Sequence, residues 1–103
     1  MMMKQKWSDV SDEAISEEGI YALHVPEEMY KFETDTYPAG QAFTVKAGND
    51  FVLYVLNGTC KTTVDGQLLQ LEAGEFLFFG KGAYQFKSTG AADVRLMRVA
   101  ART

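Results

Sequence analysis

Beyond residue 19 the chain is a succession of short segments in which apolar residues either alternate with polar ones or run without interruption. Alternation with a period of two is typical of β-strands. Turn-forming residues separate the segments about every 8–12 positions, and this spacing predicts an all-β sandwich or barrel. The predicted strands cover residues 20–25, 29–33, 42–46, 51–56, 59–64, 67–71, 75–79, 84–88 and 93–99.

Two of these segments, 51–56 and 75–79, are almost entirely apolar. Uninterrupted apolar strands are expected where both faces of a sheet are covered. Asn57-Gly58 and Asp65-Gly66 are dipeptides typical of tight hairpin turns, so we expect the strands on either side of each to pair.

Residues 1–18 differ from the rest because they are polar and acidic, with Trp7, Val10 and Ile15 among their few apolar side chains. Two interpretations have equal weight. Ser11 could cap a short helix that ends at Gly19, or the segment is an irregular arm held in place by Trp7. In both cases residues 1–18 form an N-terminal arm, and residues 19–103 form a single barrel domain.

Composition and charge narrow the classes of partner. The 103 residues carry a formal net charge of -4, which opposes binding to nucleic acid or to an anionic membrane. A single cysteine, Cys60, excludes an internal disulfide and favours a reducing compartment. The chain shows neither a secretory signal nor an apolar run of about 20 residues, so we expect a cytoplasmic protein.

Glycines and turns in the middle of the chain resemble those of a known family. Segments 54–58, 63–66 and 71–75 are similar to the central barrel of small single-domain cupins, and 74–89 resembles the second conserved cupin motif. The resemblance covers about half of the chain and extends to Val99. It implies a cupin-like double-stranded β-helix, or jelly-roll barrel, preceded by a short N-terminal arm.

The metal ligands of that family are missing at the matching positions. The glutamate of the first cupin motif falls on Phe51, the histidine pair falls within 44–47, and the histidine of the second motif falls on Gln85. A transition-metal site needs several converging imidazole, thiolate or carboxylate groups. We therefore expect no bound metal and no cofactor.

Side chains that share a face with the lost ligands are the candidates for a ligand-binding cavity. The strand at 42–46 has two open registers, with either Phe43 and Val45 or Thr44 and Lys46 pointing inward. The second register would add a positive charge at the barrel mouth and favour an anionic ligand. The candidate ligand-binding residues are Phe51, Leu53, Cys60, Thr62, Gln85, Lys87 and Met97.

Three functions follow, in order of preference. The first is a metal-free barrel that binds a small organic, possibly anionic, molecule. The second is a metal-independent isomerase, epimerase or cyclase, with His24 or Tyr84 as the acid–base group. The third is a protein-interaction module with a filled barrel.

The resemblance also implies pairing, because small cupins commonly form dimers through an early strand and the arm. We expect a homodimer, with four apolar side chains too exposed to stay uncovered. They are Tyr21, Leu23, Tyr30 and Phe32.

Overall fold

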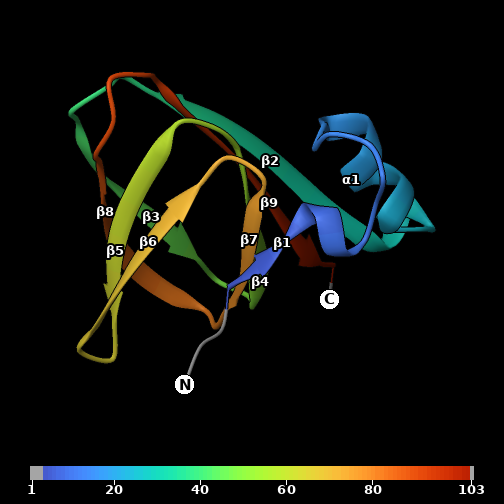
Figure 1. The fold of residues 1–103 in the computed structure, drawn as a ribbon. Helices are drawn as coiled ribbons and strands as arrows, with labels where there is room; N and C mark the ends of the chain where they lie inside the picture. Colours follow the sequence, from blue (N-terminus) through green and yellow to red (C-terminus); the bar gives the residue numbers. More distant parts are fainter. Residues whose placement is uncertain (1–3, 103) are drawn as a thin grey trace.

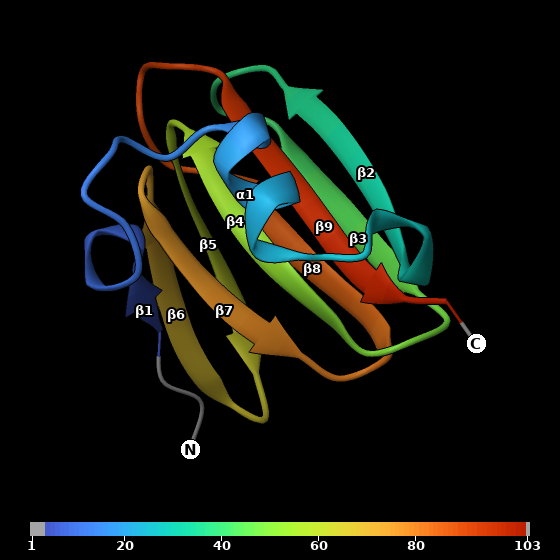
Figure 2. The same ribbon diagram turned by 90° about the vertical axis from the view of Figure 1, so that its right-hand side faces the viewer.

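The computed structural model describes residues 4–102. Two antiparallel sheets face each other as a flattened barrel (Figure 1), and a short helix lies on the outer side of one of them (Figure 2). The five-stranded sheet has the order β1-β7-β4-β9-β2, and the four-stranded sheet has the order β3-β8-β5-β6. The predicted all-β jelly-roll is confirmed.

Eight of the predicted strands are present, and β1 is one that the sequence pattern did not indicate. The strands are β1 (Gln5–Lys6), β2 (Tyr30–Tyr37), β3 (Ala42–Ala47), β4 (Phe51–Asn57), β5 (Thr59–Val64), β6 (Gln67–Glu72), β7 (Glu75–Phe79), β8 (Gly82–Ser88) and β9 (Val94–Ala101). The helical segments are η1 (Trp7–Asp9), α1 (Glu17–Leu23) and η2 (Glu27–Met29).

The strand predicted at 20–25 is wrong, because this segment belongs largely to α1. Ser16 caps the helix: its hydroxyl accepts a hydrogen bond from the Gly19 N–H at 3.0 Å. Glu17 and Glu18 lie in the first turn, where negative charge is favourable. Ser11 does not cap this helix, and the predicted domain boundary at residues 18/19 falls inside α1.

Trp7 does hold the arm in place. It is 4% exposed, and its ring meets Tyr54 edge-on with centroids 5.9 Å apart. Its backbone N–H donates to the Gly74 carbonyl at 2.7 Å. Between η1 and α1 the arm is irregular, so it combines features of both interpretations.

The turn at Asn57-Gly58 shows why a glycine is needed there. Gly58 has φ +80°, a conformation that L-residues with side chains rarely adopt. A Cβ at this position would also collide with the Asp93 backbone. The turn leads from β4 in one sheet to β5 in the other, so the pairing expected across it is wrong, whereas β5 and β6 do pair across Asp65-Gly66.

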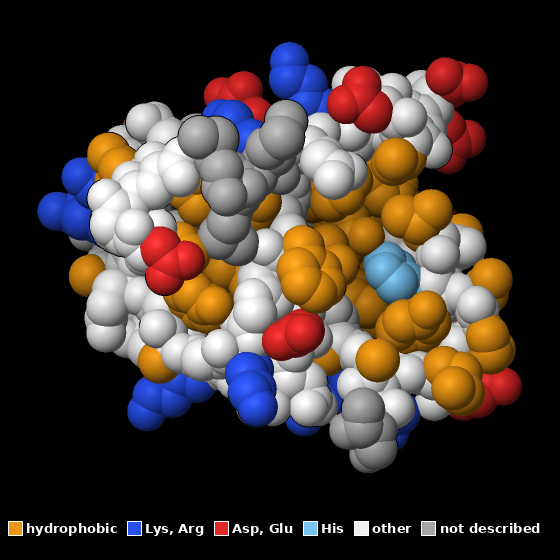
Figure 3. All heavy atoms as spheres, turned by 90° about the horizontal axis from the view of Figure 1, so that it is seen from below, with side chains coloured by type: hydrophobic (Ala, Val, Ile, Leu, Met, Phe, Trp, Pro, Cys, Tyr) orange, Lys and Arg blue, Asp and Glu red, His pale blue; other side chains and the backbone are white. Residues whose placement is uncertain are grey.

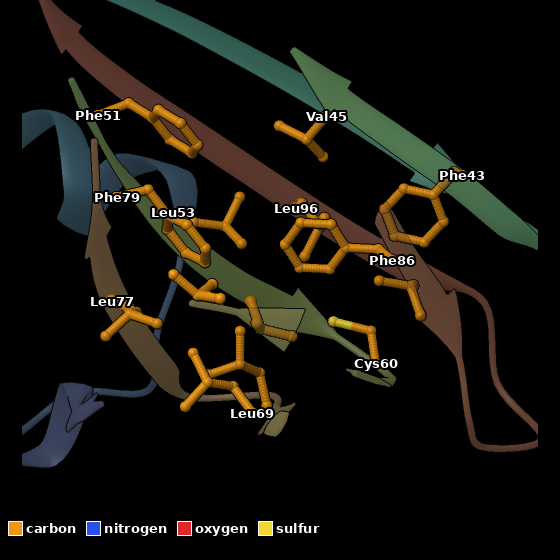
Figure 4. Packing of buried hydrophobic residues seen from close by; sticks show 14 residues of the cluster. Phe43, Val45, Phe51, Leu53, Cys60, Leu69, Leu77, Phe79, Phe86 and Leu96 are labelled. Atoms are coloured by element: carbon orange, nitrogen blue, oxygen red, sulfur yellow. The ribbon is translucent and has the colours of Figure 1, made fainter. Parts of the chain in front are cut away.

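The hydrophobic core lies between the two sheets (Figure 4). The side chains that fill it come from both sheets and are at most 9% exposed. They include Phe43, Val45, Phe51, Leu53, Val55, Cys60, Leu69, Leu71, Leu77, Phe79, Phe86, Val94 and Leu96.

A second cluster lies on the outer side of the five-stranded sheet, under the arm and α1. Its buried members are Trp7, Ile20, Tyr54, Phe76, Met97 and Val99. None of the helices in residues 4–102 is long and apolar enough to cross a membrane.

Candidate functional site

Four of the predicted cavity residues point into the barrel, where they are packed against other side chains. Phe51, Leu53 and Cys60 belong to the core, and Phe51 stacks on Phe79 with ring centroids 5.2 Å apart. Thr62 is also buried, and its hydroxyl donates to the Gln85 carbonyl at 2.6 Å. The position of the family's glutamate ligand is therefore occupied by aromatic packing.

Gln85 and Lys87 do not point into the barrel, contrary to the expected register. Both side chains are exposed, and the Thr44 hydroxyl donates to the Gln85 Oε1 at 3.1 Å on the outer surface. Because successive side chains on a strand alternate, only one set can face inward. Tyr84 and Phe86 face inward instead, and their burial is more favourable than that of an amide and an ammonium group.

The open register at 42–46 is now settled. Phe43 and Val45 point into the core, whereas Thr44 and Lys46 are exposed. Phe43 stacks on Tyr37 with ring centroids 3.7 Å apart, so β3 contributes an aromatic side chain to the core.

Met97 is buried on the opposite face from the one expected. It belongs to the outer cluster under the arm, while its neighbour Leu96 faces the core. Met97 lies opposite Tyr54 in the pairing of β4 with β9, and both side chains belong to the outer cluster.

The residues present do not fit the metal that the cupin fold commonly holds. The matching positions carry Phe51 and an outward-facing Gln85. In the part of the chain that the structure describes, no three His, Cys, Asp or Glu side chains lie close enough together to hold a metal ion.

Neither Cys60 nor Tyr84 is free to react. Burial raises the pKa of the Cys60 thiol to about 12, so the thiolate that would act as a nucleophile is scarce near neutral pH. The Tyr84 ring stands against Phe51 and Phe79, and its hydroxyl donates to the Gly80 carbonyl at 2.7 Å.

His24 lies outside the barrel, beyond the five-stranded sheet. Its Nδ1 is 2.9 Å from the Ile20 carbonyl, which can only accept a hydrogen bond, so Nδ1 carries the proton. Its ring packs edge-on against Tyr30, Phe32 and Tyr54, with centroids 5.0 to 6.1 Å apart. His24 therefore does not reach the interior, although the enzyme hypothesis requires it to do so.

At one end of the barrel, the side chains leave a pocket of about 140 Å³ beside the turn between β3 and β4. We call it the mouth pocket. It is lined by Lys31, Glu33, Lys46, Ala47, Gly48, Asn49, Phe51, Arg98 and Ala100.

Arg98 is the central polar residue of the mouth pocket. Its guanidinium pairs with Glu33 and with Asp35, the latter at 3.4 Å, and donates to the Lys46 carbonyl at 2.9 Å. The hydrogen bond from Lys31 and the charge of Arg98 hold the pKa of Glu33 below its ordinary value, against the opposing effect of burial. Arg98 was not among the residues predicted from the sequence, although it lies on the same side of β9 as Leu96.

A second surface feature lies on the outer side of the five-stranded sheet. One row of paired residues runs across four strands, from Phe78 through Val52 and Val99 to Phe32. Phe78 is 59% exposed, so the arm does not cover this end of the outer cluster.

The segment from α1 to η2 extends this surface. Leu23, Val25 and Met29 are 48%, 68% and 55% exposed, and they flank His24 along the chain. Figure 3 shows hydrophobic side chains gathered around the single histidine. We call this surface the open apolar face; it comprises Leu23, Val25, Met29, Phe32, Val52 and Phe78.

The chain matches no protein-family model and no curated protein. Several solved structures are nevertheless similar to it. The Cupin_2 domain of an XRE family transcriptional regulator from Enterobacter cloacae gives a TM-score of 0.62 at 13% identity, covering 99% of this chain and 97% of that one. The EutQ protein of Clostridium difficile gives 0.55 at 22% identity, covering 70% of this chain and 56% of EutQ.

The cupin domain of Schizosaccharomyces pombe Cnp3 is also similar, with a TM-score of 0.59 at 22% identity over 78% of this chain and 56% of that one. The chain thus spans just over half the length of the EutQ and Cnp3 chains. These likenesses and the two-sheet topology show that the chain adopts a cupin fold.

Proposed function

We propose that this protein is a protein-interaction module, a filled cupin-type barrel that assembles as a homodimer through the open apolar face. One observation carries the proposal: apolar side chains fill the interior, while a second apolar surface remains exposed outside. From the sequence alone, a ligand enclosed in the barrel is the preferred hypothesis. The packed interior supports the interaction hypothesis instead.

The size of the open apolar face supports an interface. Leu23, Val25, Met29 and Phe78 are about half exposed, so at on the order of 150 Å² each, the low end of the range for aromatic side chains, they present roughly 300 Å² together. Patches of about this size on a monomer are often functional. A standard interface buries about 800 Å² per partner, so the face would form its centre and surrounding polar residues its rim.

A second copy of the chain is the partner that fits best. In a twofold contact the same surface patch meets itself, so a patch with a net charge would repel its copy. The six residues of the open apolar face are all uncharged. The face also continues to β2, an eight-residue strand at the edge of its sheet, and such edges favour being covered.

Sedimentation equilibrium of the purified protein tests this proposal. We expect wild type to be a dimer, and Phe78→Lys to weaken the dimer by about tenfold or more, because the substitution places two ammonium groups in an apolar contact. Leu68→Lys is the matched control, since Leu68 is 63% exposed but lies on the four-stranded sheet.

Val25→Lys gives the same test outside the strands, in case Phe78→Lys perturbs folding; circular dichroism checks the fold of each variant. A wild-type protein that stays monomeric at high concentration would refute the proposal. The proposal would also be refuted if Phe78→Lys and Val25→Lys both formed dimers as stable as those of Leu68→Lys.

Metal-free binding of a small organic molecule is the second candidate function. The mouth pocket supports it, because this pocket is concave and combines charged groups with the buried Phe51 ring. The interior offers it less support, because the predicted cavity residues there pack against one another.

A further inference from the structure

We propose that the outer surface of the four-stranded sheet docks an extended acidic segment of a partner protein. This proposal goes beyond the homodimer and does not depend on it, because the four-stranded sheet and the open apolar face lie on opposite sides of the molecule (Figure 1). We call this surface the lysine face; it comprises the exposed residues Thr44, Lys46, Lys61, Leu68, Gln85 and Lys87.

The lysine face is positively charged in a chain that is acidic overall. The charged residues of β3, β5, β6 and β8 are Lys46, Lys61, Lys87 and Glu72, so these four strands carry two positive charges in excess. The whole chain, in contrast, has a formal net charge of -4. A positive patch on an otherwise negative surface favours approach of an acidic partner from this side alone.

Two of the lysines are direct neighbours. Lys61 and Lys87 lie opposite each other in the pairing of β5 with β8. Like charges at such positions destabilise a sheet, because the Cβ atoms of opposed residues are only about 4.5–5.5 Å apart. Within residues 4–102, no carboxylate lies within 4.0 Å of the ammonium groups of Lys46, Lys61 and Lys87. A carboxylate from a partner would relieve the repulsion between Lys61 and Lys87.

A hydrogen-bond donor lies next to these charges. The Thr44 hydroxyl donates to the Gln85 Oε1 at 3.1 Å, so the oxygen of the Gln85 amide is already engaged. The amide NH₂ group is a pure donor and is left to bond with an acceptor. Carboxylate oxygens are acceptors, and hydrogen bonds to them are strengthened by their charge.

The surface is hollowed where these groups meet. A shallow hollow of about 410 Å³ is lined by Lys61, Leu68, Gln85 and Lys87, and no aspartate or glutamate of the described residues lines it. The lining also includes two alanines, whose small side chains leave room beside the longer ones. The hollow therefore combines positive charge and a donor with one apolar side chain.

The third lysine sets the length of the docked segment. Ala42 pairs with Lys87, and Lys46 lies four residues further along β3, which corresponds to about 14 Å at the rise of an antiparallel strand. In an extended peptide, alternate side chains point to the same face about 7 Å apart. A segment with carboxylates at alternate positions can thus reach both Lys87 and Lys46.

An acidic protein segment fits this face better than a nucleic acid. Leu68 is 63% exposed and lines the same hollow as the lysines, so the partner gains from an apolar side chain as well as from carboxylates. Proteins that bind nucleic acid mostly have a strongly basic domain with many phosphate contacts. Here the four strands contain three lysines and no arginine, and the chain is acidic.

Fluorescence anisotropy with a labelled peptide, blocked at both ends, tests the proposal. The peptide alternates glutamate with threonine and carries one leucine at its centre. We expect saturable binding that weakens by about threefold or more when the salt concentration rises from about 0.05 to 0.3 M. The same peptide with glutamine in place of every glutamate is expected to bind about tenfold more weakly or not at all.

Lys61→Gln and Lys87→Gln each remove one charge and keep a long polar side chain. We expect each to weaken binding of the glutamate peptide by about threefold to tenfold. Lys31→Gln is the matched control, because Lys31 is an exposed lysine on β2 of the other sheet, and it is expected to bind like wild type. Circular dichroism checks the fold of each variant.

Four results would overturn the proposal. They are the absence of saturable binding up to about 1 mM peptide, equal binding of the glutamine peptide, equal weakening by Lys31→Gln and by the two variants of the lysine face, and tighter binding of a DNA oligonucleotide than of the glutamate peptide. The homodimer is tested separately: Lys61→Gln should sediment like wild type, and Phe78→Lys should bind the peptide like wild type. Failure of one proposal is therefore distinguishable from failure of the other.

Discussion

Both faces of the five-stranded sheet carry apolar side chains, yet those at the centre of the inner face are all buried, whereas some on the outer face are exposed. Toward the interior, Leu53, Leu77 and Leu96 are at most 2% exposed, because the four-stranded sheet packs over them. Toward the outside, Phe76 is 9% exposed beneath the arm, whereas Phe78, two residues further along the same strand, is 59% exposed. The arm and α1 thus cover only part of the outer face, although its apolar residues are typical of a buried face.

Substitutions at two neighbouring residues of β7 test the difference between the two faces most directly. Phe79→Ala removes a fully buried ring that packs against Phe51, Tyr84 and Phe86, so it leaves a cavity between the sheets. We expect the free energy of unfolding to fall by about 3–5 kcal/mol, as measured by urea denaturation.

Phe78→Ala is the matched control for the outer face. At a concentration where the protein is monomeric, we expect this substitution to lower the free energy of unfolding by less than about 1 kcal/mol. Most of the Phe78 ring is already in water. Equal costs for the two substitutions would contradict the distinction between the faces.

Removing the arm's anchor should have a smaller effect than opening the core. Trp7→Ala deletes the ring that covers Tyr54 and Phe76. We expect the free energy of unfolding to fall by about 2–3 kcal/mol, which is less than for Phe79→Ala because the arm can detach locally. Hydrogen exchange of the Ile20 amide, which donates to Ser16, should accelerate.

Val10→Ala is the control on the same segment, since Val10 is 45% exposed. If Trp7→Ala left the exchange of the Ile20 amide as slow as Val10→Ala does, Trp7 would not be what holds the arm.

The smallest effect concerns the ion pair that ties α1 to the sheet. The Arg95 guanidinium donates to Glu17 at 2.7 Å, and this hydrogen bond lowers the pKa of Glu17 below its ordinary value of 4.5 despite the opposing effect of burial. A lowered pKa stabilises the fold above the unfolded-state pKa, and this contribution is lost as the pH falls through the folded-state value.

Both partners are about 40% exposed, so solvent screens the pair. We expect Glu17→Gln to lower the free energy of unfolding by less than about 1 kcal/mol at pH 7, and the difference from wild type to disappear as the pH falls through the lowered pKa of Glu17. Urea denaturation across this pH range measures it. A difference that persists at low pH would mean that Glu17 acts through packing rather than charge.

Much of the fold is predictable from the sequence because its signals are local. The period-two segments and the Asn57-Gly58 and Asp65-Gly66 turns place eight strands correctly. The helix α1 was missed because Ile20, Tyr21 and Leu23 also suit a strand, and its cap depends on a single serine hydroxyl at Ser16.

The candidate site was harder to predict, because its residues meet only after folding. Glu33 and Arg98 are 65 positions apart in the chain. Their pairing depends on the register between β2 and β9, which the sequence of either strand leaves open. The cupin motif, carried onto Gln85, does not establish which way that side chain points, and in the structure it is exposed on the outer surface.

The sequence by itself determined the number and positions of most strands and the turns between them, because alternation and turn chemistry act over a few residues. It also determined that the chain carries an excess of apolar side chains. The tertiary structure alone decided which side of each strand faces inward. On β8 the side chains of Tyr84 and Phe86 face the core, whereas those of Gln85 and Lys87 are exposed to solvent. That choice rests on what the opposite sheet presents, since apolar side chains gain from burial only where others pack against them.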